Sequence, residues 1–125
     1  MQVFRHINQK YPQSFLTIGN YDGIHLGHQA ILDKLISESK SKNFPSSVMT
    51  FEPHPKEFFS PKQAPKRIIS LREKLEYFEE KAIDQVFIVN FNEKFAQLTY
   101  LNFIAILKEN IQAKKIIVGS DFKFG

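Results

Sequence analysis

Four short apolar runs divide the chain, and their spacing limits the folds that it can adopt. The runs cover residues 14–19, 46–51, 85–90 and 115–119 and are rich in β-branched and aromatic side chains. They are mostly apolar rather than alternating, as expected for strands that are covered on both faces. We therefore predict four buried β-strands.

Helical patterns occupy the intervals between these runs. The segment 70–81 begins with Ser70, a good N-cap, and Glu73 completes a capping box three residues later. The segment 27–43 predicts a helix that fades toward its polar end, because apolar side chains recur there at helical spacing. They are Ile31, Leu32, Leu35 and Ile36.

The third interval holds two helical stretches. A short one covers residues 91–98, and Thr99 is placed to cap a longer one. The apolar face of the longer helix is predicted to contain Phe103, Ile104, Leu107 and Ile111. Strands and helices thus alternate β-α-β-α-β-α-β, which indicates the α/β class and a doubly wound parallel sheet.

The loops that follow the strands are the expected place for a ligand. Right-handed crossovers put these loops at one edge of a parallel sheet, where such folds bind ligands. Three of the loops are unusual in composition, at residues 20–28, 52–67 and 120–125. We expect them to lie near each other.

Length and composition exclude several classes of protein. The chain has 125 residues, enough for one domain, and its lack of cysteine excludes disulfides, thiolate zinc sites and a cysteine nucleophile. No apolar run approaches the ~18–20 residues that cross a bilayer, and the first six residues show no signal-peptide core. We expect a soluble protein that is not exported.

The net charge of +4 lies entirely within residues 56–74, which hold six basic and two acidic side chains. An anionic small ligand nearby, a nucleic-acid groove and a solvated loop and helix face all fit this segment. It shows no stripe of interleaved aromatic and basic side chains. We therefore predict no nucleic-acid partner, and the lack of a membrane-spanning apolar run predicts no membrane partner.

The first loop carries a pattern suited to anion binding. His25 and His28 flank Gly27 at the start of a helix, where unpaired N–H groups attract anions. Two imidazoles three residues apart can both donate hydrogen bonds to phosphate oxygens. One alternative is that the two His residues only cap the helix or bind nothing. A less favoured alternative is a zinc site, to which His54 and Asp22 could contribute further ligands.

The segment 19–28 reads Gly-x-Tyr-Asp-x-x-His-x-Gly-His and resembles the nucleotidylyltransferase superfamily. Three more segments, at 49–59, 91–98 and 118–125, resemble prokaryotic bifunctional FAD synthetases (riboflavin kinase/FMN adenylyltransferase). Tyr21 stands where that family usually has Phe. The resemblance covers nearly the whole chain from Ser14.

The resemblance implies a Rossmann-like sheet of nucleotidylyltransferase type and an adenylyltransferase that converts ATP and FMN to FAD and diphosphate with Mg²⁺. The implied catalytic residues are His25 and His28, and no side chain is assigned as a metal ligand, although Asp22 is a candidate. A cytoplasmic location is implied as well. The implied ATP-binding residues are Gly19, Asn20, Tyr21, Asp22, Gly23, His25, Gly27 and His28.

Two other segments are the implied flavin side of the site. Aromatic rings there are suited to stack on or wall the isoalloxazine ring, with core packing as the alternative. Phe91 and Phe95 are read as core residues, with Asn92 beside them. The implied flavin-binding residues are Pro53, Pro55, Phe58, Phe59, Asp121, Phe122 and Phe124.

The family continues beyond the last motif, with a phosphate-binding Ser/Thr-Ser/Thr-x-x-Arg segment and a kinase domain that phosphorylates riboflavin. We therefore expect residues 1–125 to be the N-terminal portion of such an adenylyltransferase domain, without the kinase domain. The alternatives are a catalytically silent fragment that binds ATP or flavin, and a nucleotidylyltransferase with a different phosphate acceptor.

Overall fold

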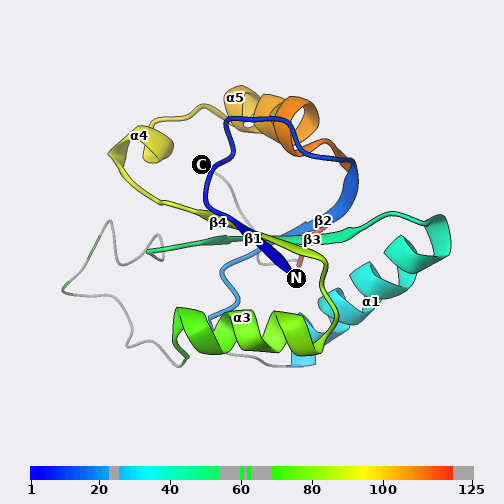
Figure 1. Ribbon diagram of the computed structural model, residues 1–125. Coiled ribbons are helices and arrows are strands. Elements are labelled where there is room, and N and C mark those ends of the chain that lie inside the picture. Colours follow the sequence, from blue (N-terminus) through cyan, green and yellow to red (C-terminus); the bar gives the residue numbers. More distant parts are fainter. Residues whose placement is uncertain (23–25, 54–59, 61, 63–68, 120–125) are drawn as a thin grey trace.

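A computed structural model describes residues 1–22, 26–53, 60, 62 and 69–119. Within these residues five strands form one parallel sheet in the spatial order β1-β4-β3-β2-β5 (Figure 1). The strands are β1 (Gln2–Phe4), β2 (Ser14–Ile18), β3 (Ser46–Phe51), β4 (Gln85–Val89) and β5 (Ala113–Ile117). The predicted parallel α/β sheet is confirmed, and β1 is a strand that the sequence did not predict.

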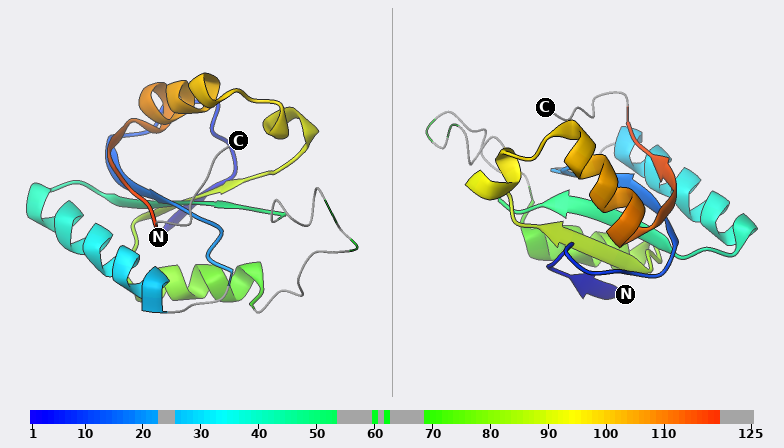
Figure 2. Two further views of the ribbon diagram at one scale, coloured as in Figure 1. Left: turned by 180° about the vertical axis from the view of Figure 1, so that it is seen from behind. Right: turned by 90° about the horizontal axis from the view of Figure 1, so that it is seen from above.

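Helices cover both faces of the sheet (Figures 1 and 2). Helices α1 (Leu26–Lys42) and α3 (Leu71–Glu80) lie on one face. Helices α4 (Glu93–Ala96) and α5 (Tyr100–Ala105) and the π-helical segment η1 (Ile106–Ile111) lie on the other. This arrangement confirms the doubly wound prediction.

The order of the strands reverses next to β2. From β2 the chain steps sideways to β3 and then to β4, and it then crosses back over the sheet to place β5 on the other side of β2. The reversal therefore lies between β2 and β5, whose carboxyl ends point the same way because the two strands are parallel.

Local capping explains where three helices begin. Ser70 Oγ accepts from the Glu73 amide at 3.1 Å and the Glu73 carboxylate accepts from the Ser70 amide at 3.2 Å, so the predicted capping box is present. Asn92 caps α4 and Thr99 caps α5 in the same way, by accepting from Phe95 N and Asn102 N. Each such cap stabilises its helix by about 1 kcal/mol.

Two predictions about the last helix and strand need correction. Ile104 is 37% exposed, because the buried stripe of this helix consists of positions four apart, Phe103, Leu107 and Ile111. Strand β5 begins and ends two residues earlier than predicted. Its pairing with β2 decides its limits, and the register with β2 shifts by one residue at Lys114.

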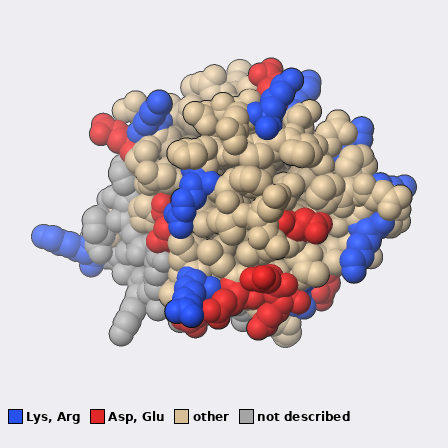
Figure 3. Space-filling view, viewed as in Figure 1, with Lys and Arg blue, Asp and Glu red and all other residues tan. Residues whose placement is uncertain are grey.

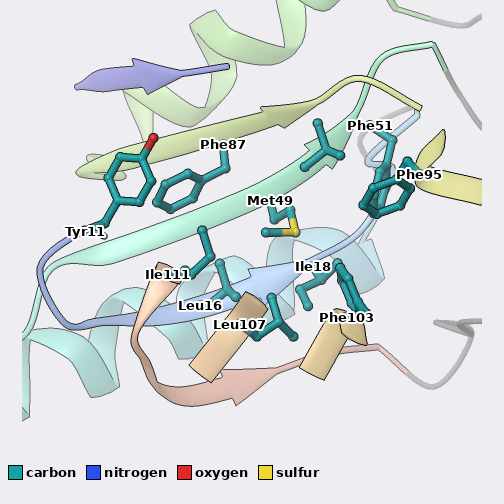
Figure 4. Packing of buried hydrophobic residues seen from close by; sticks show 11 residues of the cluster. Tyr11, Leu16, Ile18, Met49, Phe51, Phe87, Phe95, Phe103, Leu107 and Ile111 are labelled. Atoms are coloured by element: carbon teal, nitrogen blue, oxygen red, sulfur yellow. The ribbon is translucent and has the colours of Figure 1, made fainter. Parts of the chain in front are cut away.

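A hydrophobic cluster fills each side of the sheet. Figure 4 shows the cluster under α5 and η1, where side chains of β2, β3 and β4 meet those of the helices. The cluster on the opposite face joins the sheet to α1 and α3 through Leu32, Leu35 and Phe78, which are all fully buried. In the described residues we find no helix long and apolar enough to cross a membrane.

Candidate functional site

The turn that follows β2 lies beside the point where the strand order reverses. Residues 19–22 leave the carboxyl end of β2, and α1 begins at Leu26. In open parallel sheets, ligands bind beyond the carboxyl ends of the strands at such a reversal. The loop at 120–125 and most of the loop at 52–67 lie outside the described residues. The expectation that these loops lie near the turn stays a prediction.

Gly19 allows this turn to fold back on itself. Its amide donates to the Met49 carbonyl of β3 at 3.0 Å, which continues the sheet pairing. A Cβ at this position would stand 2.9 Å from the Cε2 atom of Tyr21, closer than such atoms approach. The sequence therefore needs glycine here to let the Tyr21 ring pack against the turn.

Tyr21 is held in an unusual backbone conformation. Its φ is +50°, in the left-handed region that aromatic residues rarely adopt. The side chain is 3% exposed, and its hydroxyl shares a 2.8 Å hydrogen bond with the hydroxyl of Thr17, which is fully buried. Burial and this bond compensate for the strain, so the ring has a fixed position.

The ring of Tyr21 supports the imidazole of His28. The two ring centres are 4.9 Å apart, and on another side Tyr21 meets Phe78 of α3 edge-on at 5.4 Å. His28 lies in the first turn of α1 and is half-buried. The structure thus brings together two of the residues that the sequence singled out, while His25 and Gly23 lie outside the described residues.

A buried lysine from α3 reaches the same turn. Lys74 is 5% exposed, and its Nζ donates to the carbonyl oxygen of Asn20 at 2.6 Å and to Thr50 Oγ1 at 3.2 Å. Thr50 Oγ1 donates to the same carbonyl at 3.1 Å. The turn is therefore fixed from β3 and from α3 at one backbone oxygen.

Sequence reasoning did not single out Lys74 within the basic segment 56–74, and the solvated face that was one interpretation of that segment does not hold for this buried residue. A signal was present, because Lys74 precedes Phe78 by four residues and follows Leu71 by three, on the apolar side of the helix. Arg72 of the same segment is exposed and pairs with Glu76 at 3.1 Å. Figure 3 shows acidic side chains gathered over α3 and basic ones scattered over this face.

Oxygen atoms suited to a hard cation also occur in this turn. Asn20 Oδ1 is a buried atom that has no hydrogen-bond partner, and Asp22 is half-buried two residues later. The described residues contain no group of three or more His, Asp or Glu side chains arranged to hold a metal ion. A metal ion here would need ligands beyond these side chains, such as phosphate oxygens and water.

The loop after β3 is described only at its start. The Glu52 amide donates to the Val89 carbonyl at 2.9 Å, and the peptide bond from Glu52 to the half-buried Pro53 is cis. Pro53 thus follows the carboxyl end of β3, the strand that lies between β2 and β4. The other implied flavin-side residues lie outside the described residues: Pro55, Phe58, Phe59, Asp121, Phe122 and Phe124.

The aromatic residues after β4 belong to the core. Phe95 is 8% exposed and meets Phe51 and Phe91 at ring distances of 5.7 and 5.4 Å. Phe91 is partly buried against the same cluster, and Asn92 caps α4. The prediction that the two Phe side chains are core residues is confirmed.

An open groove of about 640 Å³ lies at the opposite end of the sheet, near the amino ends of β1 and β4. Its lining includes Ser39, Asp84 and Gln85, and each of these polar groups already bonds within the protein. These three polar groups are therefore engaged within the protein, and the other polar residues that line the groove are Gln2, Lys40 and Asn43. The turn after β2 is the stronger candidate.

Comparisons with known proteins show which proteins the chain is similar to. The model of a family described as FAD synthetase matches residues 7–125. A bifunctional riboflavin kinase/FMN adenylyltransferase of Escherichia coli K12 is 48% identical over the whole chain, and the one from Haemophilus influenzae is 41% identical. The chain spans 42% of the length of each of these relatives.

A solved structure shows the same arrangement of elements. It is described as a macrolide-efflux protein from Streptococcus pneumoniae, with a TM-score of 0.75 and 25% identity. The likeness covers 98% of this chain and 42% of that one. It supports the α/β fold independently of the sequence motifs.

Proposed function

The chain belongs to the FAD synthetase family, and from this we propose that the protein transfers the adenylyl group of ATP to FMN and forms FAD and diphosphate. The relatives' names include a second activity, riboflavin kinase, which we do not assign to these 125 residues. We place the reaction in the cytoplasm, where ATP is supplied.

The observation that carries this proposal is the strained turn at residues 19–22, which leads from β2 into α1 beside the reversal of strand order. A turn of this kind presents backbone N–H groups and the start of a helix to one point in space. Phosphate groups bind at such points. Within the family match, the phosphates are those of ATP.

The reaction needs no nucleophilic side chain. An oxygen of the FMN phosphate attacks the α-phosphorus of ATP, the bond from that phosphorus to the bridging oxygen breaks, and diphosphate leaves. The rate acceleration then comes from positioning of the two substrates and from stabilisation of the charge that develops on the phosphates. We assign both effects to residues of the turn after β2 and of the start of α1.

His28 and His25 are the proposed catalytic residues. Their imidazoles donate hydrogen bonds to phosphate oxygens on which charge grows as the bond to diphosphate breaks. The contact between His28 and the fixed ring of Tyr21, at 4.9 Å, supports this role because it limits the orientations of the imidazole. The turn residues proposed to line the ATP subsite are Gly19, Asn20, Tyr21, Asp22, Gly23 and Gly27.

The flavin subsite is proposed beyond the carboxyl ends of β3 and β5. Pro53 supports it by its place after the end of β3, the strand that pairs with β2. The remaining flavin-side residues are proposed from the sequence: Pro55, Phe58, Phe59, Asp121, Phe122 and Phe124.

Mg²⁺ fits this site as a companion of ATP. The ion prefers oxygen ligands and keeps several waters, so one or two protein oxygens suffice. Asp22 and the unpartnered Asn20 Oδ1 are such oxygens. When bound, Mg²⁺ would supply positive charge to the phosphates.

The direct test is product formation by the protein as its gene encodes it. Purified protein is incubated with ATP, Mg²⁺ and FMN, and FAD and diphosphate are quantified by chromatography and a coupled assay. We expect the two products in equal amounts. Absence of both from a folded preparation would overturn the assignment.

Two further arms separate the alternatives. Replacing FMN by other phosphate acceptors tests for a different nucleotidylyltransferase, and product with another acceptor alone would support that reading. Ligand-induced thermal stabilisation of the 125-residue chain tests binding without turnover. We expect stabilisation by FAD, which carries both the adenylyl and the flavin parts.

A further inference from the structure

Lys74 has an unusual environment for a lysine. It lies on α3, on the side that faces the sheet, and it is 5% exposed. Burial of an ammonium is unfavourable unless protein oxygens replace its water. Among the described residues, its ammonium meets oxygens of Asn20, in the turn after β2, and of Thr50, in β3.

The three groups form a closed triangle around one carbonyl. Asn20 O accepts from Lys74 Nζ at 2.6 Å and from Thr50 Oγ1 at 3.1 Å, and the two donors are themselves 3.2 Å apart. A carbonyl oxygen has two acceptor sites, so both are used. The orientation of this peptide group is therefore set from two scaffold elements.

That orientation passes directly to the strained residue. Asn20 precedes Tyr21, whose φ is +50° and whose ring meets both Phe78 of α3 and His28 of α1. Lys74 and Phe78 are one turn apart on α3 and act on the peptide and on the ring of neighbouring residues. Helix α3 thus holds the turn at two points.

We propose that Lys74 is a positioning residue of the nucleotide-binding turn: its ammonium fixes the Asn20 carbonyl, and through Tyr21 it sets the position of the His28 imidazole. Lys74 acts from behind the turn and is not itself a catalytic residue. The kinetic part of the test rests on the proposed function, whereas the spectroscopic part does not.

Three variants isolate this role. Lys74→Met removes the ammonium and keeps an unbranched chain in the buried space. Thr50→Val removes the second donor but leaves the charge of Lys74, so it separates positioning from electrostatic attraction of ATP. Lys81→Met is the matched control, because it removes a cation from the end of the same helix, where Lys81 pairs with Asp33 at 3.1 Å.

The first readout is the NMR signal of the His28 ring in the ligand-free protein, assigned with His28→Gln. We expect Lys74→Met and Thr50→Val to move this signal and Lys81→Met to leave it in place. A merely structural lysine would lower the melting temperature without moving it. This readout decides the proposal even if the protein makes no FAD, an outcome that would count against the proposed function alone.

The second readout compares the change in the KM for ATP with the change in the KM for FMN. We expect Lys74→Met to raise the KM for ATP about tenfold and Thr50→Val about threefold, as for loss of a charged and a neutral hydrogen bond. The KM for FMN should change less than about twofold, and the double variant should add little to Lys74→Met because both act on one oxygen.

Equal increases for both substrates, or an unmoved His28 signal in folded Lys74→Met, would overturn the proposal. If Lys74→Met does not fold, Thr50→Val decides it by the same two criteria. Thr50→Val with a wild-type His28 signal and wild-type KM for ATP would then also overturn it.

Discussion

The two ends of the central strands both carry buried polar groups, but these groups bond in different ways. At the amino ends, the buried Ser46 donates from its N at 2.9 Å and from its Oγ at 3.2 Å to the carboxylate of the exposed Asp84, and the buried Ser47 Oγ donates to the buried Gln85 at 3.2 Å. These bonds join β4 and its entry to the adjacent strand β3.

At the carboxyl ends, the bonds leave the sheet. Thr17 bonds to Tyr21, and Thr50 and Lys74 bond to the Asn20 carbonyl, so side chains of two strands and a helix fix a turn. The turn includes Tyr21 at positive φ, and the side-chain oxygen Oδ1 of Asn20 is buried there without a hydrogen-bond partner. Polar groups at the amino end thus stabilise the sheet, and those at the carboxyl end shape a site at some cost in stability.

The largest expected effect belongs to the carboxyl end and concerns activity. We expect His28→Ala to lower the turnover number about 10²–10³-fold, because an imidazole that stabilises developing charge contributes roughly 3–4 kcal/mol to the transition state. FMN affinity should change little, since His28 is assigned to the phosphates of ATP. Steady-state kinetics and FMN titration measure the two quantities.

His6→Ala is the matched control, because His6 is an exposed histidine near the amino terminus. Wild-type turnover in His28→Ala would show that His28 is not a catalytic residue. It would also contradict the assignment of a functional role to the carboxyl end.

The next effect belongs to the amino end and concerns stability. Asp84→Ala leaves the buried Ser46 amide without its acceptor, so we expect the free energy of unfolding to fall by about 2 kcal/mol. The turnover number per folded molecule should not change. Urea denaturation followed by circular dichroism measures the first quantity, and an assay corrected for the folded fraction measures the second.

Asp84→Asn keeps an acceptor oxygen and should lose less stability than Asp84→Ala. A turnover number that falls with Asp84→Ala while the protein stays folded would show that the two ends are not independent.

Local signals predicted the elements whose limits are decided locally. The capping box at Ser70 and Glu73 placed the start of α3, and the apolar run at 46–51 matched β3 residue for residue. Strand β1 has three residues and no pattern of its own, and it exists because Gln2–Phe4 pair with β4. Pairing between distant segments is not visible in one segment's composition.

The sequence singled out residues of the candidate site but not the contacts that hold them in place. The motif pointed to Tyr21 and His28, and the structure places their rings in contact. The link from Lys74 to Asn20 spans 54 residues, and it depends on how α3 packs on the sheet. The sequence therefore singled out Tyr21 and His28, whose rings meet, but it did not indicate which side chains hold the turn.

A smaller effect separates the hydroxyl of Tyr21 from its ring. Tyr21→Phe leaves the buried Thr17 hydroxyl without this partner, so we expect a loss of about 1 kcal/mol in unfolding free energy. The contacts of the ring with His28 and Phe78 remain, and activity should change less than about threefold. Tyr21→Leu removes the aromatic ring and should lower turnover more than Tyr21→Phe. Equal turnover in the two variants would contradict a role of the ring in placing His28.

The smallest expected effect lies outside both ends, at the ion pair that joins α1 to β5. Lys115 Nζ donates to Glu38 Oε1 at 2.7 Å, and this hydrogen bond lowers the pKa of Glu38 below its ordinary value of 4.5. A carboxyl group whose pKa is lower in the folded state stabilises the fold above its unfolded-state pKa, and that contribution is lost as the pH falls through the folded-state pKa. Glu38→Gln should therefore lower the melting temperature slightly at pH 7 and not at a pH below the lowered pKa.

The pair is partly exposed, so added salt should also shrink the difference at pH 7. Glu80→Gln, at an exposed glutamate at the end of α3, serves as the control and should show a smaller dependence on pH. A cost of Glu38→Gln that persists unchanged at low pH would mean that the residue contributes through packing on α1 rather than through its charge.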